Sequence, residues 1–312
     1  MDFVESVLDH FDIENIDKIN TRDIPHFENN KLGVIKLMQR LKLLPVSKLH
    51  SCGRKMNFIK RNKYRDKYCF FCQRCRSESS LRSGTFFENA KLDLDQIFLI
   101  IYCVVYKNDS QEALRREAKL GSNHTACDWK NFLRDVFVNY FLMNSTLIGG
   151  PGINVQIDES LICKRKANVG RLLRNQQTWI VGGVDSNGNV FMEQTKVRSA
   201  EILDDIISRN VLPGSNIVTD GWLGYNNISS INDYDHQRVI HDREFVNTDG
   251  YHTNRIEGTW SAFKRLYRKV TNKKEGMLAS YIAEFMFHFK FKGRVLSETL
   301  KTINQIYNVS FL

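Results

Sequence analysis

The hydrophobic pattern of residues 252–264, "HTNRIEGTWSAFK", repeats with the period of a helix. Because successive helical residues turn by about 100°, one side of this predicted helix is apolar. Its members are Ile256, Trp260, Phe263 and Tyr267. Glu257 and Lys264 lie on the polar flank beside this stripe, two turns apart. Taken alone, such a flank is typical of a solvated salt-bridge face.

Further helices are predicted in the first half of the chain. Residues 1–45 are typical of short amphipathic helices. The apolar run Ile97–Tyr106, "IFLIIYCVVY", is about half as long as a membrane-spanning helix, so we expect a core helix there. Two stretches that open on capping residues flank Gly121, "DSQEALRREAKLG" and "SNHTACDWKNFLRDVFVNYFL". Two capped helices around a glycine turn predict a helix-turn-helix.

The pattern changes to strands after "GGPG" at residues 149–152. "INVQIDES", "TWIVGGVDSNGNVFMEQT" and "SNIVTDG" are each apolar runs bounded by turn residues, and the middle one predicts a hairpin across "SNGN". A second domain of α/β type is therefore expected to begin there.

Composition narrows the class of protein. The chain has 312 residues and 42% hydrophobic content, which indicate a globular protein. Its formal net charge of +10 indicates either a polyanionic partner, most commonly nucleic acid, or a basic surface that resists aggregation. The amino terminus is acidic and lacks the features of a signal peptide. We therefore expect an intracellular protein, whose seven cysteines are thiols or metal ligands.

Residues 49–88 are basic, rich in cysteine and poor in aliphatic side chains. Such a segment cannot bury a large core and needs another source of stability. The spacing predicts a structural zinc site, with the ligand candidates Cys52, Cys69, Cys72 and Cys75. The first knuckle retains only Cys52, and His50 competes with Cys69 and Cys72 for the remaining places. The alternative is a small basic subdomain with buried thiols.

The second capped helix is a candidate for DNA contact. It would present His124, Lys130 and Asn131 to a groove, although many helical bundles share this spacing without binding DNA. The basic segment that precedes it favours DNA, because phosphate contacts need lysine and arginine.

Two predicted strands carry an aspartate near their polar ends, Asp158 in "VQIDES" and Asp220 in "NIVTDG". Singly, an aspartate at a strand end is usually a turn former. Together with Glu257 they supply three carboxylates, which are the ligands that a two-metal phosphoryl-transfer site needs. In that case Trp260 and Phe263 would hold the helix on the sheet and direct Glu257 to the metals.

The succession "QIDES", "KRKANVGR", "WIVGGVD", "IVTDGW", "HTNRIEGTWSAFK" resembles the DDE transposases of the Merlin superfamily and their bacterial ISXO2-like relatives, over about residues 45–295. The resemblance implies an RNase H-like catalytic domain, with a mixed five-stranded sheet and flanking helices, after a zinc-ribbon-like segment and a helix-turn-helix. "SLRSGTFF" also resembles the family's linker. The expected parts are an N-terminal helical segment (1–48), the ribbon (49–90), the helix-turn-helix region (91–148), the catalytic domain (149–295) and a C-terminal tail (296–312).

The resemblance also implies roles for particular residues. Asp158, Asp220 and Glu257 would bind two Mg²⁺ or Mn²⁺ ions, and Lys264 would be the accompanying lysine. Some relatives carry asparagine as the third member, so Asn254 is an alternative to Glu257. The basic run after the first strand would clamp the transposon end through Lys164, Arg165, Lys166 and Arg171, although such a run is usually a solvated face.

These features predict a cut-and-paste transposase. It would bind terminal inverted repeats and target DNA, act as a homodimer or larger oligomer, and involve no membrane. A eukaryotic host would place it in the nucleus, and a bacterial host in the cytoplasm or nucleoid. The alternatives are a domesticated DNA-binding descendant, an RNase H-like nuclease without strand transfer, and a basic structural protein.

Overall fold

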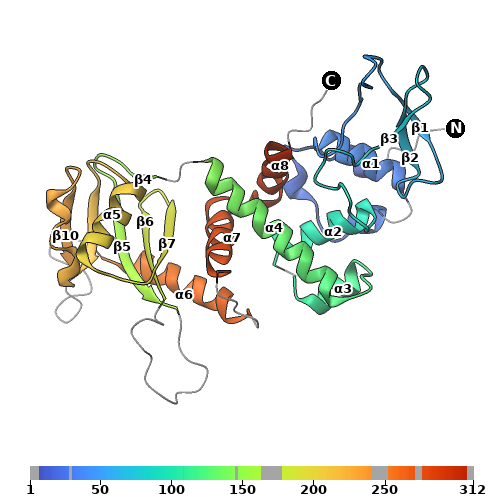
Figure 1. Ribbon diagram of the computed structural model, residues 1–312. Helices are drawn as coiled ribbons and strands as arrows, with labels where there is room; N and C mark the ends of the chain where they lie inside the picture. The colour runs from blue at the N-terminus through green and yellow to red at the C-terminus, as the bar shows by residue number, and fades with distance from the viewer. Residues whose placement is uncertain are drawn as a thin grey trace. The chain divides into compact units, whose positions relative to one another are not determined.

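The computed structural model describes residues 7–27, 30–107, 109–144, 147–162, 178–239, 252–270 and 276–307. The chain forms two compact units (Figure 1): residues 1–140 with 291–312, and residues 141–290. Among the described residues, none of the helices combines the length and the hydropathy that a membrane crossing requires.

The first unit is mostly helical and contains one small antiparallel sheet. The sheet has the order β1-β2-β3, with β1 (Asn57–Lys60), β2 (Tyr68–Phe71) and β3 (Glu78–Ser80). The α-helices are α1 (Lys31–Arg40), α2 (Leu94–Val105), α3 (Gln111–Glu117), α4 (Asn123–Met143) and α8 (Val295–Tyr307). Three short 3-10 helices precede them: η1 (Val7–His10), η2 (Ile16–Lys18) and η3 (Ile24–Phe27).

One hydrophobic core joins the helices of the first unit. The apolar run at residues 97–106 falls almost wholly in α2, and Ile97, Phe98 and Ile101 are fully buried, which confirms the predicted core helix. Residues 296–312, which we described as a tail, include most of α8. Leu296 and Leu300 of that helix are fully buried in the same core.

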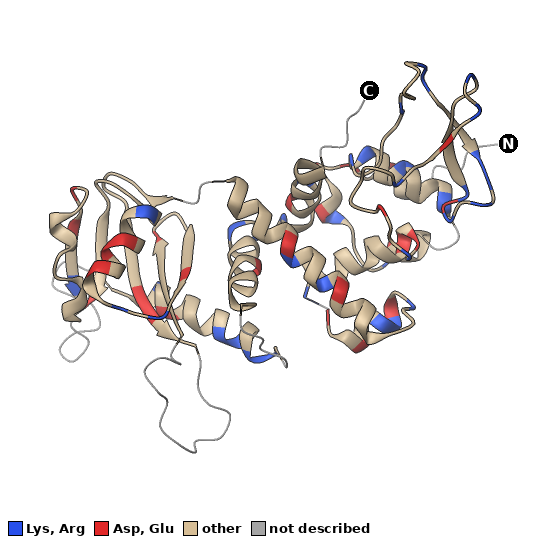
Figure 2. Cartoon of the chain, viewed as in Figure 1, with Lys and Arg blue, Asp and Glu red and all other residues tan. Residues whose placement is uncertain are grey.

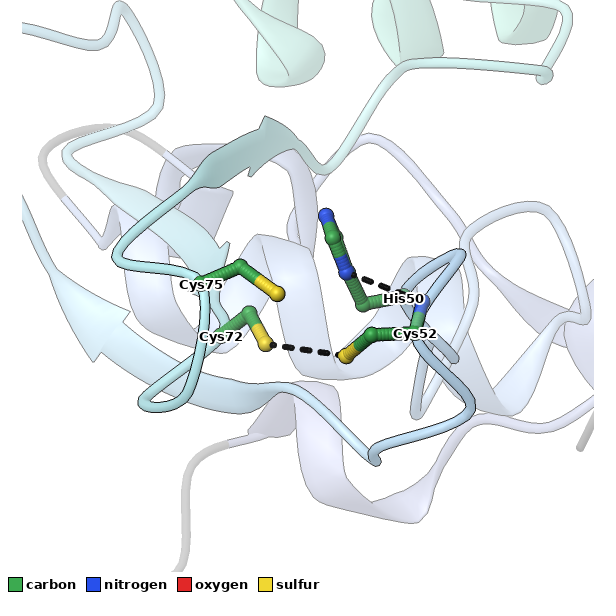
Figure 3. A group of neighbouring side chains, drawn as sticks. All are labelled: His50, Cys52, Cys72 and Cys75. Carbon is green, nitrogen blue, oxygen red and sulfur yellow. Dashed lines mark hydrogen bonds between the residues drawn. The ribbon is translucent and has the colours of Figure 1, made fainter.

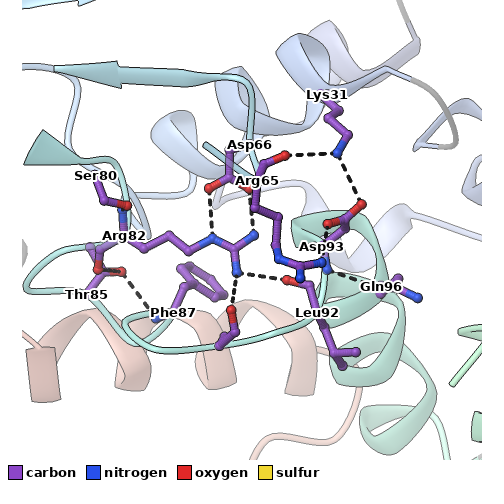
Figure 4. A network of polar contacts seen from close by, with 11 residues as sticks. Lys31, Arg65, Asp66, Ser80, Arg82, Thr85, Phe87, Leu92, Asp93 and Gln96 are labelled. Carbon is purple, nitrogen blue, oxygen red and sulfur yellow. Dashed lines mark hydrogen bonds and ion pairs between the residues drawn. The ribbon is translucent and has the colours of Figure 1, made fainter. Parts of the chain in front are cut away.

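Arg82, in the "SLRSGTFF" stretch, joins the ribbon to the start of α2 (Figure 4). Its buried guanidinium forms two hydrogen bonds with the buried carboxylate of Asp66, at 2.8 and 2.6 Å. The same guanidinium donates to the carbonyls of Ala90 and Leu92, at 3.0 and 2.8 Å. Because the Arg82 guanidinium binds both Asp66 and these two carbonyls, it fixes the segment between the small sheet and α2.

The second unit contains a mixed five-stranded sheet in the order β10-β9-β5-β6-β7. β5 (Asn154–Leu161), β9 (Asn216–Asp220) and β10 (Asp235–Val239) are parallel. β6 (Trp179–Asp185) is antiparallel to β5 and pairs with β7 (Val190–Thr195), so the predicted hairpin across "SNGN" is confirmed. A short parallel pair, β4 (Ile148–Gly149) and β8 (Val211–Leu212), completes the strands.

Helices cover both faces of this sheet. α5 (Ala200–Asn210) packs on one face with the 3-10 helices η5 (Leu223–Tyr225) and η6 (Ile228–Ser230). α6 (Asn254–Arg268) and α7 (Leu278–Lys290) pack on the other. The predicted apolar stripe of α6 is buried, with exposed fractions of 0–6%. The face of the sheet that α6 covers is also the face on which the side chains of Asp158 and Asp220 lie.

Candidate active site and metal centres

Asp158 and Asp220 lie on neighbouring parallel strands. β5 and β9 pair in the register Asn154 with Asn216 and Gln156 with Val218. Continuing this register by two residues brings Asp158 level with Asp220. Alternate residues of a strand share one face, so both aspartates are on the same face, where both strands approach their carboxyl ends.

A tryptophan on α6 contacts Asp158 directly. The indole Nε1 of Trp260 donates to Oδ2 of Asp158 at 3.0 Å. Across the sheet Asp158 pairs with Gly182 of β6. A Cβ at residue 182 would lie 2.7 Å from the indole ring. Gly182 therefore provides the space through which Trp260 reaches the carboxylate.

Negative charge accumulates around Asp158. Burial, followed by the charges of Glu159 and Asp220, raises the pKa of the Asp158 carboxyl to about 6, although the Glu159 amide and Trp260 oppose this shift. Nearby carboxylates that repel one another in this way favour a bound divalent cation. The oxygen donors at this strand edge therefore fit Mg²⁺ or Mn²⁺.

Glu257 lies in the first turn of α6 and is exposed. The hydroxyl of Thr253 donates to its Oε1 at 3.4 Å. Asn254, the alternative third ligand, is the first residue of the same helix and is also exposed. Lys264 lies on the polar flank two turns further along and is half-buried.

The amino terminus of α6 is fixed to the strand that carries Asp158. Oε1 of Gln156 accepts hydrogen bonds from the backbone amides of Arg255 and Ile256, at 3.0 and 3.1 Å. Its Nε2 lies 3.2 Å from Nδ1 of His252. Free amides at a helix start need such an acceptor. Gln156 therefore caps α6 from two residues before Asp158, on the same face of the sheet.

Our sequence analysis missed the roles of Gln156 and Glu159. Side chains alternate between the two faces of a strand, so the sequence placed Gln156 on the same face as Asp158. However, the helix that Gln156 caps begins 98 residues later, and no local pattern marks that contact. Glu159 is the acid next to Asp158, and its contacts also come from distant segments.

A second group of possible metal ligands lies in the first unit (Figure 3). The ligand atoms of His50, Cys52, Cys72 and Cys75 all lie within 4.8 Å of one another. No other such group of three or more His, Cys, Asp or Glu side chains occurs in the part of the chain that the structure describes, so the three carboxylates are less closely gathered. The turn before β1 supplies one imidazole and one sulfur, and the knuckle after β2 supplies the other two sulfurs. One nitrogen and three sulfurs are a donor set that fits zinc.

Two thiols of this group have shifted pKa values. The hydrogen bond with Cys52, followed by burial, raises the pKa of Cys75 to about 11. Hydrogen bonds, the largest from the backbone of Arg54 and the next from His50, lower the pKa of Cys52 to about 6. The sulfur of Cys52 lies 3.7 Å from that of Cys72. Zinc binds the thiolate form, so a lowered thiol pKa favours metal binding.

Cys69, which we included among the candidates, does not belong to this group. It lies in β2 opposite Ile59 and Ser80 and is fully buried. An extended chain alternates its side chains between two faces, so Cys69 and Cys72, three residues apart, point in different directions. His50, named as its competitor, takes the fourth place.

The predicted DNA-contacting residues differ in their surroundings. His124 is exposed at the start of α4. Lys130 forms an ion pair with Asp109 at 2.8 Å, and Asn131 accepts a hydrogen bond from Arg134. Lys164, Arg165, Lys166 and Arg171 lie outside the described residues.

The sheet and its acids define a class of protein. Numbered within the five-stranded sheet, β7, β6, β5, β9 and β10 are strands three, two, one, four and five, the order of the RNase H-like fold. Asp158 lies on strand one, Asp220 on strand four, and Glu257 on α6, the helix that follows strand five. This is the arrangement of a DDE catalytic domain.

A comparison with known protein families matches one part of the chain. Residues 144–290 match the family model described as ISXO2-like transposase domain. The resemblance found in the sequence is thereby confirmed. No curated protein matches the chain.

A solved structure also resembles the chain. It is a chain of a simian T-cell lymphotropic virus intasome in complex with the PP2A regulatory subunit B56 gamma. The similarity covers 61% of this chain and 67% of that chain, with 15% identity and a TM-score of 0.32.

Proposed function

We propose that the protein is a DNA transposase that cleaves the terminal inverted repeats of a mobile element and joins the 3′-hydroxyl ends to target DNA. The observation that carries this proposal is the placement of Asp158 and Asp220 on adjacent parallel strands, under a helix that carries Glu257. The ISXO2-like transposase domain in the same residues supports it.

Two Mg²⁺ or Mn²⁺ ions held by Asp158, Asp220 and Glu257 would activate the attacking oxygen and stabilise the leaving one. The chain itself supplies orientation. Trp260 holds one oxygen of Asp158, which leaves the other available as a ligand. Gln156 holds the start of α6, and therefore Glu257, above the same strand.

Basic side chains would hold the DNA. The second half of α6 carries Lys264, Arg265 and Arg268, and Lys269 caps the helix (Figure 2). Lys264 would contact a phosphate near the scissile bond, and residues 164–171 would clamp the transposon end. Lys130 is a weaker candidate because Asp109 already neutralises its charge.

The first unit would recognise the element's ends. A zinc ion held by His50, Cys52, Cys72 and Cys75 would stabilise the ribbon, and α3 with α4 would contact the duplex. Since two ends must be cut and joined together, the active form would be at least a homodimer. Action on DNA would place the protein in the nucleus of a eukaryotic host, or in the cytoplasm or nucleoid of a bacterial one.

The test is cleavage and joining of labelled duplexes made from the DNA that flanks the gene. With Mg²⁺ or Mn²⁺ the wild type should yield joined product, and Glu257→Gln should yield none. Glu201→Gln is the matched control, because Glu201 is an exposed acid in the first turn of α5 and should leave activity unchanged.

Other outcomes identify the alternatives. Sequence-specific binding without cleavage by the wild type would indicate a domesticated DNA-binding protein. Cleavage without joining would indicate an RNase H-like nuclease. Activity that survives in Glu257→Gln but not in Asn254→Ala would move the third ligand to Asn254.

A further inference from the structure

A fourth carboxylate, Glu159, is buried and follows the proposed ligand Asp158 in the sequence. It follows Asp158 in β5, but alternation along the strand turns its side chain to the opposite face. Only 4% of that side chain is exposed. A buried carboxylate needs a donor for each oxygen, and Glu159 has one on each: the hydroxyl of Tyr225 on Oε2 and Nη1 of Arg198, at 3.2 Å, on Oε1.

Tyr225 belongs to the turn that follows Asp220. It is the last residue of η5 and is fully buried. At the start of this turn, the amide of Trp222 donates to Oδ1 of Asp220 at 3.0 Å. The hydrogen bond between Tyr225 and Glu159 therefore connects the residue after Asp158 with the turn after Asp220.

Arg198 makes a second connection between the same places. Its guanidinium lies 3.9 Å from the ring centre of Trp179 and 4.7 Å from that of Trp222, so it stacks on both indoles. The same guanidinium pairs with Glu159. One arginine from the segment between β7 and α5 thus links β5, the start of β6 and the turn after Asp220.

We infer that Glu159, Tyr225 and Arg198 are positioning residues that set the distance between the carboxylates of Asp158 and Asp220. The inference rests on the proposed metal-dependent function. Neither contact touches the reacting atoms. Each contact restrains the backbone beside one aspartate relative to the backbone beside the other, and groups that orient metal ligands in this way contribute strongly to metal affinity.

The test measures binding of Mn²⁺ to the DNA-free, full-length protein by electron paramagnetic resonance, together with the Mn²⁺ concentration that half-saturates cleavage. Tyr225→Phe removes only the hydroxyl. We expect it to weaken Mn²⁺ binding about tenfold and to recover most of its cleavage rate at saturating Mn²⁺. Asp158→Asn identifies the fraction of Mn²⁺ bound at this site.

Tyr234→Phe is the matched control. Tyr234 is also buried in the second unit, and its hydroxyl also donates one hydrogen bond, at 2.7 Å to the carbonyl of Val211. Tyr234→Phe should lose stability without a change in Mn²⁺ affinity. Arg198→Met replaces a side chain that is 40% exposed, and it should weaken Mn²⁺ binding as Tyr225→Phe does. If Tyr225→Phe does not fold, Arg198→Met tests the positioning role in its place.

The outcomes separate the two proposals. If Tyr225→Phe, or Arg198→Met in its place, binds Mn²⁺ as tightly as Tyr234→Phe does, the positioning role is wrong and the proposed function stands. If the wild type and Asp158→Asn bind Mn²⁺ equally, the metal site itself is wrong, and the proposed function fails with it.

Discussion

Gly182 has no side chain at the point where the indole of Trp260 passes over β6 to reach Asp158. We predict that Gly182→Ala displaces the indole, because the added Cβ would lie 2.7 Å from the ring and 3.1 Å from the carbonyl of Phe191. Overpacking of this kind costs about 1–3 kcal/mol of unfolding free energy. Urea denaturation should show that loss, and cleavage should fall as well, because Asp158 loses its donor.

Gly258 provides the control for this substitution. It lies in α6, and a Cβ there would meet no atom within 4 Å. Gly258→Ala should therefore raise the free energy of unfolding, by up to about 1 kcal/mol, since alanine favours a helix over glycine. Equal effects of the two substitutions would show that the space above Gly182 has no special role.

The zinc site makes a prediction that separates two cysteines. Cys75→Ser should reduce the bound zinc, measured by elemental analysis of the purified protein, because Cys75 belongs to the group of four ligands. Cys69→Ser should retain the zinc, although it replaces a buried thiol in β2. Zinc loss in Cys69→Ser with retention in Cys75→Ser would reverse the assignment.

The choice of His50 over Cys69 shows what the sequence could and could not predict for single residues. Spacing identified the right segment, because zinc ligands cluster within short loops. Cys69, Cys72 and Cys75 are spaced three residues apart, so the spacing allows two C-x-x-C pairs, Cys69 with Cys72 or Cys72 with Cys75. The extent of β2 decides between the two pairs, because Cys69 lies within the strand. Asp158, Asp220 and Glu257 stand out as candidates in the sequence, because each lies in or directly after a strongly apolar pattern, and their role as ligands stays a prediction.

At the level of elements, β10 is one of the two edge strands of the large sheet. It pairs with β9 through the backbone and also through the side chain of His236. Nε2 of His236 lies 2.9 Å from the hydroxyl of Thr219. Burial, followed by the charge of Arg238, lowers the pKa of His236 to about 4, from an ordinary value of 6.5. Between these pH values the unfolded chain takes up a proton that the folded sheet does not, so stability falls as the pH falls.

We therefore predict a loss of about 1 kcal/mol at this histidine between pH 7 and pH 5, a value reduced for its partial exposure to solvent. Urea denaturation at the two pH values measures it. The wild type should lose more stability than His236→Gln over this interval. Identical losses in both proteins would contradict the assignment of a neutral, partly buried ring.

The sequence predicted elements best where one period repeats. α6 and the β6–β7 hairpin are examples, because their burial patterns are local. It did not predict which strands are neighbours, and the placement of Asp158 beside Asp220 depends on a parallel pairing across about 60 residues. Nor did it predict α8, whose buried residues are recognisable only beside the core that they complete.

At the level of the whole molecule, each unit has its own core. We predict that the chain does not unfold as a single two-state system. Circular dichroism reports both units. Tryptophan fluorescence mainly reports the second, because three of the four tryptophans, Trp179, Trp222 and Trp260, are there.

A zinc chelator should therefore lower the midpoint of the first unit's transition, seen by circular dichroism, and leave the main fluorescence transition in place. Trp129→Phe removes the single tryptophan of the first unit and makes the fluorescence signal specific for the second. Coincident transitions that move together on chelation would show that the two units unfold as one.

The return of α8 to the first unit has a consequence for synthesis on the ribosome. Residues 141–290 are translated before α8 emerges, whereas Leu296 and Leu300 fill the core that residues 1–140 begin. All residues of the second unit are therefore in the chain before the first unit can close its core. We conclude that the first unit completes its fold only after α8 has been added. A nascent chain stalled near residue 290 would need a chaperone to cover the exposed apolar surface of residues 1–140.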